Sequence, residues 1–262
     1  MPFLEIRGLS KSFEIPGGAP VQALSSIDLD VARGEFVVIV GHNGSGKSTL
    51  LSILGGELNE WEGTVSVGGS PLDQDAGRAS LLKQDPAKNV ALDLTVEENL
   101  YLADIARGLE ARRPSIIRSF RKREKPLGRL RGGVDGLSDL GQLVRTLSGG
   151  QRQLLAIQLA MAQDPDVVLL DEPTASLDQS NAGKVIDVLE ETWKSGMTVL
   201  LVTHDLATAR QLGSRLVVMR DGRVVADYVG EDRAALTLEA LYDRCGFGII
   251  QEGTEQPFDA AQ

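Results

Sequence analysis

The sequence has few of the residues on which several protein classes depend. It contains one cysteine, Cys245, and two histidines among 262 residues, and only 4% of its residues are aromatic. A single cysteine excludes an internal disulfide framework, which is consistent with the cytosol. Long apolar stretches are also missing, because the longest aliphatic runs (residues 36–40, 167–170 and 199–202) are far shorter than the ~18 residues typical of a membrane span. The N-terminus lacks a basic segment followed by a long apolar one, so we expect no signal peptide.

The hydrophobic residues that are present predict an α/β protein. Their share, 42%, is ordinary for a soluble protein, and 262 residues can bury a sizeable core. Each aliphatic run is typical of a strand that is buried on both faces of a parallel sheet. Residues 4–7 and 27–31 instead alternate apolar and polar side chains, as half-buried antiparallel strands do.

A glycine-rich loop follows the first aliphatic run. Residues 41–48 match the pattern G-x-x-x-x-G-K-[ST], and residues 48–58 after them are predicted to be helical. Backbone N–H groups of such a loop surround phosphates, Lys47 can reach the β- and γ-phosphates, and Ser48 can ligate Mg²⁺. The alternative is a glycine turn that carries Lys-Ser by chance. The residues expected to bind the nucleotide here are Gly41, Asn43, Gly44, Ser45, Gly46, Lys47, Ser48 and Thr49.

Polar residues follow the other two aliphatic runs. Asp171 and Glu172 come directly after residues 167–170, and His204 follows residues 199–202. Ligands of parallel sheets bind at the carboxyl ends of the strands. We expect Asp171 to hold Mg²⁺, Glu172 to accept a proton from the attacking water, and His204 to act at the γ-phosphate. The alternatives are that the two carboxylates cap the next helix and that the histidine is structural.

Gln84 stands where the core sequence passes into a second compositional zone. Its amide could contact Mg²⁺ or the attacking water and respond to movement of that zone; the alternative is a glutamine that merely ends a strand. A predicted helix over 95–103 opens the zone, with Thr95 as its N-cap. We predict one domain over 1–262, with an ATP-binding core (1–86 and 151–250), an inserted helical subdomain (87–150) and a disordered tail (251–262).

The run over residues 147–151 predicts a second anion site. Ser148, Gly149, Gly150 and Gln151 open an apolar-periodic helix, whose N-terminus favours negative charge. Because one glycine loop is sufficient for one nucleotide, we infer that a nucleotide is shared between two molecules.

These motifs, in this order, resemble the nucleotide-binding domain of the ATP-binding cassette (ABC) family over nearly the whole chain. The resemblance implies a P-loop NTPase (RecA-like) α/β core with an antiparallel β subdomain and an inserted α-helical subdomain. Residues 176–178 are similar to the family's D-loop, so Asp178 is expected at the nucleotide. Phe13 occupies the position of the aromatic ring that stacks on adenine; the alternative is a core phenylalanine.

The resemblance also implies the partners of the chain. In the family, two cassettes bind head to tail, and each ATP lies between the glycine loop of one and the segment equivalent to Ser148–Gln151 of the other. Membrane subunits convert closure and reopening into transport. The implied cofactors are therefore ATP and Mg²⁺. The implied partners are a second, identical cassette, transmembrane permease subunits and, for an importer, a substrate-binding protein. No nucleic acid is expected, and the implied location is peripheral, at the cytoplasmic face of the membrane.

Weaker motifs bear on the transported substrate. The Gln84-Asp85-Pro86 loop, the helix over 95–100 and a signature helix without the two arginines common in import cassettes resemble cassettes of amino-acid importers of the tryptophan or tyrosine type. The alternatives are an exporter or lipid-extracting ABC ATPase, a soluble ABC ATPase that acts on DNA or ribosomes, and a P-loop domain without turnover.

The net charge of −10 is unevenly distributed. Residues 107–131 carry ten basic and two acidic side chains, a net +8, so the rest of the chain carries −18. An acidic body with one basic patch argues against general nucleic-acid binding and for a local anionic contact. We hypothesise that this segment docks against the membrane subunits or the anionic lipid around them; the alternative is a solvated charged loop.

Neutralising Arg118, Arg121, Lys122 and Arg123 should weaken assembly at the membrane, because each basic residue near an anionic leaflet contributes about 1 kcal/mol. ATP hydrolysis by the purified chain should not change. Copurification with membrane subunits measures the first effect, and unchanged assembly would contradict docking.

Overall fold

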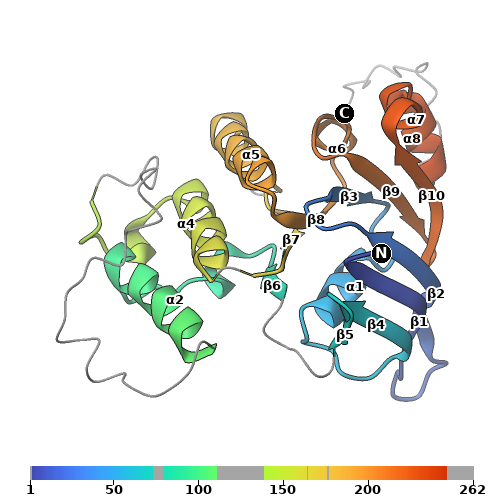
Figure 1. Ribbon diagram of the computed structural model, residues 1–262, viewed down its shortest axis with the longest axis horizontal. Helices are drawn as coiled ribbons and strands as arrows, with labels where there is room; N and C mark the ends of the chain where they lie inside the picture. The colour runs from blue at the N-terminus through green and yellow to red at the C-terminus, as the bar shows by residue number, and fades with distance from the viewer. Residues whose placement is uncertain (1, 73–78, 111–138, 164, 176, 247–262) are drawn as a thin grey trace, which may run out of the picture.

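The computed structural model describes residues 2–72, 79–110, 139–163, 165–175 and 177–246, which form two sheets and a helical arm (Figure 1). The larger sheet has the order β10-β9-β3-β8-β7-β6 and the smaller, antiparallel sheet the order β2-β1-β4-β5. The strands are β1 (Leu4–Phe13), β2 (Val21–Val31), β3 (Phe36–Val40), β4 (Glu62–Val67), β5 (Ser70–Pro71), β6 (Ala79–Leu82), β7 (Val167–Asp171), β8 (Thr198–Thr203), β9 (Arg215–Arg220) and β10 (Arg223–Val229).

Helices lie on both faces of the larger sheet and in the arm beyond its β6 edge. They are α1 (Lys47–Leu54), α2 (Val96–Glu110), α4 (Gly149–Ala162), α5 (Gln179–Lys194), α6 (Leu206–Gln211), α7 (Gly230–Ala234), α8 (Leu238–Cys245) and the short 3₁₀ turns η2 (Pro86–Lys88) and η3 (Val144–Thr146). Within the described residues, no helix has the length and apolarity needed to cross a bilayer.

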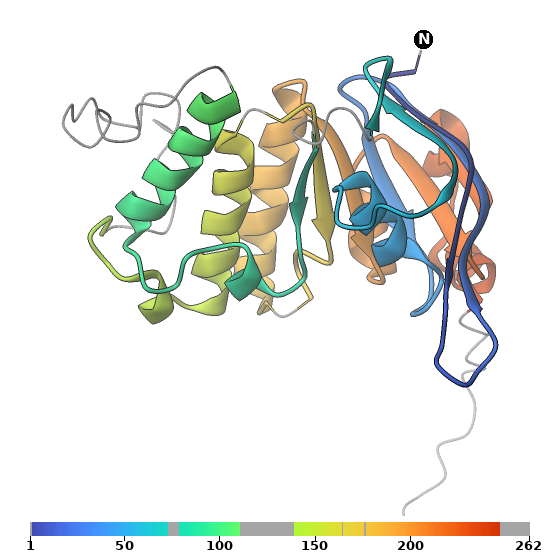
Figure 2. The same ribbon diagram turned by 90° about the horizontal axis from the view of Figure 1, so that it is seen from below.

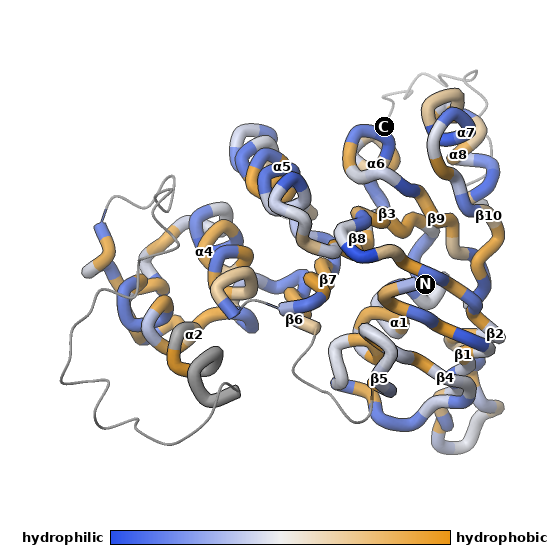
Figure 3. The backbone as a smooth tube through the Cα atoms, in the orientation of Figure 1, coloured by the Kyte–Doolittle hydropathy of each residue, from blue (hydrophilic) through white to orange (hydrophobic). Residues whose placement is uncertain are grey.

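Strand β3 forms the centre of the larger sheet, and both of its faces are covered. It pairs in parallel with β8 on one side and β9 on the other, and all five of its residues are buried. Val37 and Ile39 pack toward α1 and the antiparallel sheet, whereas Val38 and Val40 pack toward α5 and α6. Figure 3 shows the resulting concentration of hydrophobic residues in the strands. The predicted α/β fold with its antiparallel subdomain is confirmed.

Several elements differ in length from the sequence prediction. The helix expected over 48–58 ends at Leu54, because Gly55 and Gly56 follow and the φ of Gly56 is +74°. The antiparallel strands are longer than the alternating segments, since β1 and β2 continue as a hairpin whose outer residues are largely exposed. Near the end of the described chain, Thr237 caps α8, and Gly246 ends this helix in the left-handed conformation.

The helical arm is built on α4, which has two buried faces. Leu155 and Leu159 pack against Val96 and Leu100 of α2, while Leu154 and Ile157 of the same helix pack against the sheet. The arm is therefore packed against the core through α4. Residues 111–131 of the basic segment and the tail 251–262 lie outside the described residues.

The single cysteine, Cys245, lies at the end of α8 with its side chain buried. Burial raises the pKa of its thiol to about 11, so the group is a neutral, unreactive thiol at physiological pH.

Arg215 of β9 joins the two sheets through one guanidinium. It donates to Asp227 Oδ1 (2.7 Å) and Oδ2 (2.5 Å) on β10, to Glu35 Oε1 (3.4 Å) and to the backbone oxygen of Asp30 on β2 (2.6 Å). Its side chain is only 14% exposed. A bidentate ion pair in this position stabilises more than a solvated one does.

Arg215→Ala should lower the free energy of unfolding by about 2 kcal/mol, because it leaves carboxylates and a carbonyl without their donor. Urea unfolding would measure the change. Lys194→Ala is the matched control, since its pair with Glu190 is solvent-exposed, and it should cost about 0.5 kcal/mol or less. Equal effects of the two substitutions would contradict a special role for Arg215.

Candidate functional site

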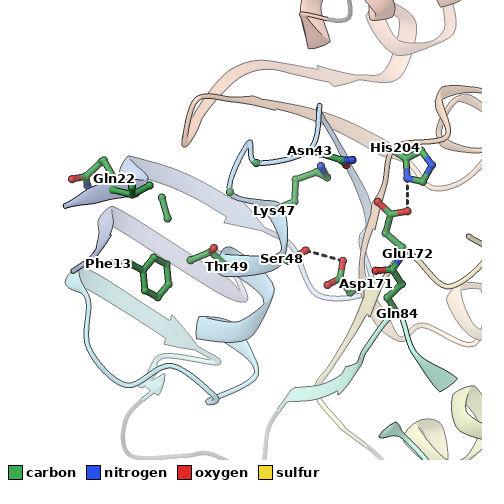
Figure 4. A pocket seen from close by; sticks show the side chains of 14 residues that line it. Phe13, Gln22, Asn43, Lys47, Ser48, Thr49, Gln84, Asp171, Glu172 and His204 are labelled. Atoms are coloured by element: carbon green, nitrogen blue, oxygen red, sulfur yellow. Dashed lines mark hydrogen bonds and ion pairs between the residues drawn. The ribbon is translucent and has the colours of Figure 1, made fainter. Parts of the chain in front are cut away.

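The register of the larger sheet brings three strand ends to one edge. Val40 pairs with Thr203, and Asp171 pairs with Val202, so the residues that follow β3, β7 and β8 emerge side by side. A cleft of about 600 Å³ opens there (Figure 4). Its lining residues are Phe13, Val21, Gln22, Ala23, Asn43, Gly44, Gly46, Lys47, Ser48, Thr49, Gln84, Asp171, Glu172 and His204.

Lys47 is held by the loop that precedes it. Its ammonium donates to the backbone oxygens of Gly41 (2.8 Å) and His42 (3.0 Å) and lies 3.4 Å from Ser45 Oγ. Burial lowers the pKa of Lys47, while the nearby Glu172 and Asp171 raise it. The loop therefore holds the Lys47 ammonium at the cleft, where phosphate oxygens can replace the two backbone oxygens as its hydrogen-bond acceptors.

Ser48 and Asp171 form a pair of oxygen donors beside the lysine. Ser48 Oγ donates to Asp171 Oδ1 at 3.2 Å. Burial raises the pKa of Asp171, opposed by the Ser48 hydrogen bond and the charge of Lys47. A hydroxyl, one carboxylate and the amide of Gln84 are hard oxygen ligands, which suit Mg²⁺ when it also binds substrate phosphates. The donor set thus fits this metal.

Glu172 and His204 face each other across the ends of β7 and β8. Glu172 Oε2 contacts His204 Nδ1; the carboxylate is mostly buried and the imidazole is about half exposed (Figure 4). Glu172 has a φ of +53°, a left-handed conformation that costs a non-glycine residue energy. Its backbone N–H donates to Val202 O at 2.9 Å, which keeps the turn in place and directs the carboxylate into the cleft.

Gln84 enters the cleft from the other side. It follows β6, which pairs in parallel with β7, so it emerges next to Asp171 with an exposed side chain. The predicted proximity of the glutamine to the carboxylates is therefore present in the geometry, whereas a glutamine that only ends a strand would not need to line the cleft.

The β1–β2 hairpin supplies the opposite wall, part of which the sequence motifs did not reveal. Phe13 is 38% exposed at the cleft, with Lys11 Nζ 5.2 Å from its ring centre. Val21, Gln22 and Ala23 of β2 line the same wall, and Figure 2 shows the dark blue hairpin extending beyond the body. No local motif marks these three residues; their only signal is their antiparallel pairing with the strand that carries Phe13.

A second unforeseen element, the turn between β9 and β10, supports the glycine loop from behind. Gly222 N donates to Ser45 O (3.2 Å), and Gly222 O accepts from Ser25 N (2.8 Å). A Cβ on Gly222 would lie 2.7 Å from Ala23 O, and one on Gly46 would lie 2.5 Å from the same oxygen. Both residues have positive φ. The loop is thus wedged between a hairpin turn and β2, and only glycine fits on either side.

The predicted signature residues do not line this cleft. Ser148 is the N-cap of α4, where Ser148 Oγ accepts from Gln151 N (3.2 Å) and Gln151 Oε1 accepts from Ser148 N (2.9 Å). Ser148 and Gly149 are exposed, and Gly150 is buried. The second anion site predicted from sequence is therefore a capped helix start that lies outside the cleft lined by the chain's own phosphate loop.

Asp178 is placed at the N-terminus of α5, also outside the cleft. It accepts from Asn181 N (3.0 Å) and Asn181 Nδ2 (2.6 Å), which hold its pKa below its usual value. A Cβ on Gly150 would lie 2.6 Å from Asn181 Cγ, so the signature helix and the Asp178 turn are packed directly against each other.

The mainly parallel sheet, the glycine loop after its central strand and the buried lysine at the start of α1 define a P-loop nucleoside triphosphatase. A model described as "ABC transporter" matches residues 24–175, more than half of the chain. The chain belongs to the ABC transporter family, as an ATP-binding subunit that hydrolyses ATP.

Individual relatives span different transport systems. The chain is 34% identical to a tyrosine transport ATP-binding protein of Clostridioides difficile (strain R20291), over 94% of this chain and all of that protein. It is 36% identical to a macrolide export ATP-binding/permease protein of Paracoccus denitrificans (strain Pd 1222), over 86% of this chain but 33% of that protein. Its fold is similar to a dimeric ATP-binding cassette in a post-hydrolysis state bound to ADP and Pi, with a TM-score of 0.73 and 28% identity over 86% and 98% of the two chains.

Gly222→Ala should weaken ATP binding about tenfold, since the new methyl group meets Ala23 O and must displace the turn that supports the glycine loop. Titration with a fluorescent ATP analogue would measure the affinity.

Gly69→Ala is the matched control for the backbone strain. Gly69 has a φ of +81°, but no atom lies within 4 Å of the position that its Cβ would take, so the substitution strains the backbone without a clash. It should leave ATP affinity unchanged; comparable weakening by both substitutions would contradict the support role of Gly222.

Proposed function

We propose that two copies of this chain bind head to tail around two ATP molecules and drive the permease subunits of an importer for a small molecule, with amino acids as the favoured class. The observation that carries the proposal is the separation of two anion sites in one chain. Lys47 and the carboxylates line one cleft, and the capped, exposed start of α4 lies outside it. A second copy can supply its Ser148 to this cleft, whereas the chain's own Ser148 is not there. The similar cassette of known structure is a dimer bound to ADP and Pi, which supports the pairing of two copies.

In the proposed reaction, residues of one chain bind the nucleotide and prepare the water. Phe13 stacks on the adenine, the glycine loop surrounds the phosphates, and Lys47 neutralises charge on the β- and γ-phosphates. Glu172 accepts the proton of the attacking water, and His204, whose Nδ1 faces that carboxylate, presents Nε2 toward the γ-phosphate. The partner copy's Ser148, Gly149, Gly150 and Gln151 complete the γ-phosphate site from the other side, and Asp178 lies at the contact between the copies.

Mg²⁺ would be held by Ser48, Asp171 and Gln84. When bound, it would supply positive charge that stabilises the transferring phosphoryl group. Ser48 Oγ, which donates to Asp171, would then serve as a ligand, and the positive charge would oppose the rise that burial causes in the pKa of Asp171.

The direction and substrate of transport rest on weaker support. The tyrosine transport relative matches over its whole length, which favours import of an amino acid. The macrolide export relative is as similar in its matched third, which keeps export as the second candidate. Isolating the chain from membranes and identifying the proteins that accompany it would separate them, because a substrate-binding protein belongs only to an importer. The proposed location is peripheral, at the cytoplasmic face of the membrane.

The proposed function also divides the chain into a core and an insertion. Residues 1–86 and 151–250 form the ATP-binding core, and 87–150 form the helical insertion that presents the signature. The described parts of α2 and η3 support this insertion, although α4 begins in it and then packs on the core sheet.

Glu172→Gln should lower the rate of ATP hydrolysis by about a hundredfold or more, because an amide cannot accept the proton of the attacking water. ATP binding should persist, so the variant should accumulate as an ATP-bound dimer in size-exclusion chromatography. Glu190→Gln, which changes an exposed carboxylate on α5, is the control and should behave as wild type. Wild-type turnover in Glu172→Gln would rule out Glu172 as the base.

A further inference from the structure

Asn89 closes the loop that carries Gln84. Its Oδ1 accepts from Lys83 N (3.0 Å), and its Nδ2 donates to Lys83 O (2.9 Å) and Asp85 O (3.2 Å). The Asn89 side chain is thus hydrogen-bonded to the backbone of both neighbours of Gln84, Lys83 and Asp85. The other hydrogen bonds of this loop run within residues 85–89, through the Asp85 cap and η2. Asn89 therefore supplies the connection between the loop and the end of β6.

Asn99 makes a second connection of the same kind, one step farther along the chain. Its side chain is buried, at 3% exposure, in helix α2. Asn99 Oδ1 accepts from Ala91 N (2.8 Å), and its Nδ2 donates to Ala91 O (2.9 Å) and Thr95 O (2.9 Å). Because a buried amide is costly unless it is paired, three satisfied bonds fix the position of Ala91 relative to α2.

Backbone pairing extends this connection to the signature. Arg145 N donates to Leu92 O (2.9 Å), and Val144 N donates to Leu94 O (2.9 Å). Three residues after Val144, Leu147 is buried in the same cluster as Val96 and Leu100 of α2, and Ser148 follows it. Gln84 and Ser148 are therefore joined by hydrogen bonds and packed side chains, with an asparagine at each of the two loop junctions.

We propose that Asn89 and Asn99 are positioning residues that transmit the position of Gln84 in one nucleotide site to Ser148, which serves the nucleotide of the partner copy. The inference rests on the proposed function, since it assumes that Gln84 responds to nucleotide and that Ser148 acts on a second chain. Without Asn89, the loop can pivot at Gln84 while α2 stays in place. Without Asn99, the loop and α2 lose their shared anchor at Ala91. At the two loop junctions the connecting bonds are made by the side chains of Asn89 and Asn99, so single substitutions can remove them while the backbone bonds of Val144 and Arg145 remain.

Hydrogen exchange measured by mass spectrometry tests the transmission in the full chain, with and without a non-hydrolysable ATP analogue and Mg²⁺. In the wild type, the analogue should slow exchange in peptides that cover residues 83–89, 96–103 and 144–151. Asn89→Ala should bind the analogue with an affinity within about twofold of wild type but lose most of the response in the last two peptides. Its ATP hydrolysis should fall about tenfold or more with little change in KM, because a misplaced Gln84 affects the reaction more than binding.

Two further variants keep the test decisive. Asn59→Ala removes an exposed asparagine from the loop after α1 and should respond as wild type. Asn89→Asp keeps the acceptor for Lys83 N but removes both donations at nearly constant size, so it carries the test if Asn89→Ala does not fold. Asn99→Ala should uncouple residues 144–151 while the response at 83–89 remains.

The outcomes separate the inference from the function on which it rests. A wild-type response of residues 96–103 and 144–151 in a folded Asn89 variant would overturn the transmission and leave the proposed ATPase dimer intact. A purely structural role for Asn89 would lower the melting temperature and raise exchange equally with and without analogue, so the difference between the two states would survive; that result also overturns the inference. A wild-type chain that does not bind the analogue would overturn both.

Discussion

The parallel pairing of β3 with β8 and of β8 with β7 is the constraint on which the site depends. The register sets Val40 beside Thr203 and Asp171 beside Val202, so that a loop, two carboxylates and a histidine leave the sheet at one level. A shift of one residue in β7 would turn Asp171 and Glu172 to the opposite faces of the sheet. Successive side chains of these strands pack alternately into two apolar layers, and a shift of one residue would move each side chain into the other layer. Hydrophobic packing therefore fixes the positions of polar groups that contribute little to the core themselves.

The same sheet also prevents the start of α4 from reaching the glycine loop of its own chain. Helix α4 is anchored by one face to the sheet and by the other to α2, so its N-terminus cannot swing toward the chain's own glycine loop without exposing one of two apolar faces. Gly150 adds a close contact with Asn181, whose amide holds Asp178. The signature start and the Asp178 turn are thus packed together at one corner of the chain. A corner with an exposed serine and an exposed carboxylate is suited to contact with a neighbouring molecule.

How much of this could be predicted from the sequence depends on how local each signal is. The glycine loop, the carboxylates after β7 and the helix start at Ser148 are contiguous, and each carries its own chemistry, so their placement follows from motif and strand order. Gly222 shows the opposite case: an Asp-Gly turn is common, and its support of Ser45 depends on a contact over more than 170 residues. The same holds for Gln22 in the wall beside Phe13. The early end of α1 follows from a local signal, the glycine pair at 55 and 56. The side-chain bonds of Asn89 and Asn99 span only four to eight residues, but an asparagine carries no pattern that identifies its backbone partners.

The distance between the glycine loop and the signature in one chain has a genetic meaning. In a head-to-tail pair, a copy that lacks Lys47 still presents a sound Ser148, and a copy that lacks Ser148 still has a sound phosphate loop. Paired together, they form one composite site with both lesions and one with neither. In such a pair, two inactive alleles can therefore complement each other in the same cell. When a mutant chain pairs with a normal one, loss of Lys47 damages the site built on the mutant's phosphate loop. Loss of Ser148 instead damages the site built on the normal copy's phosphate loop.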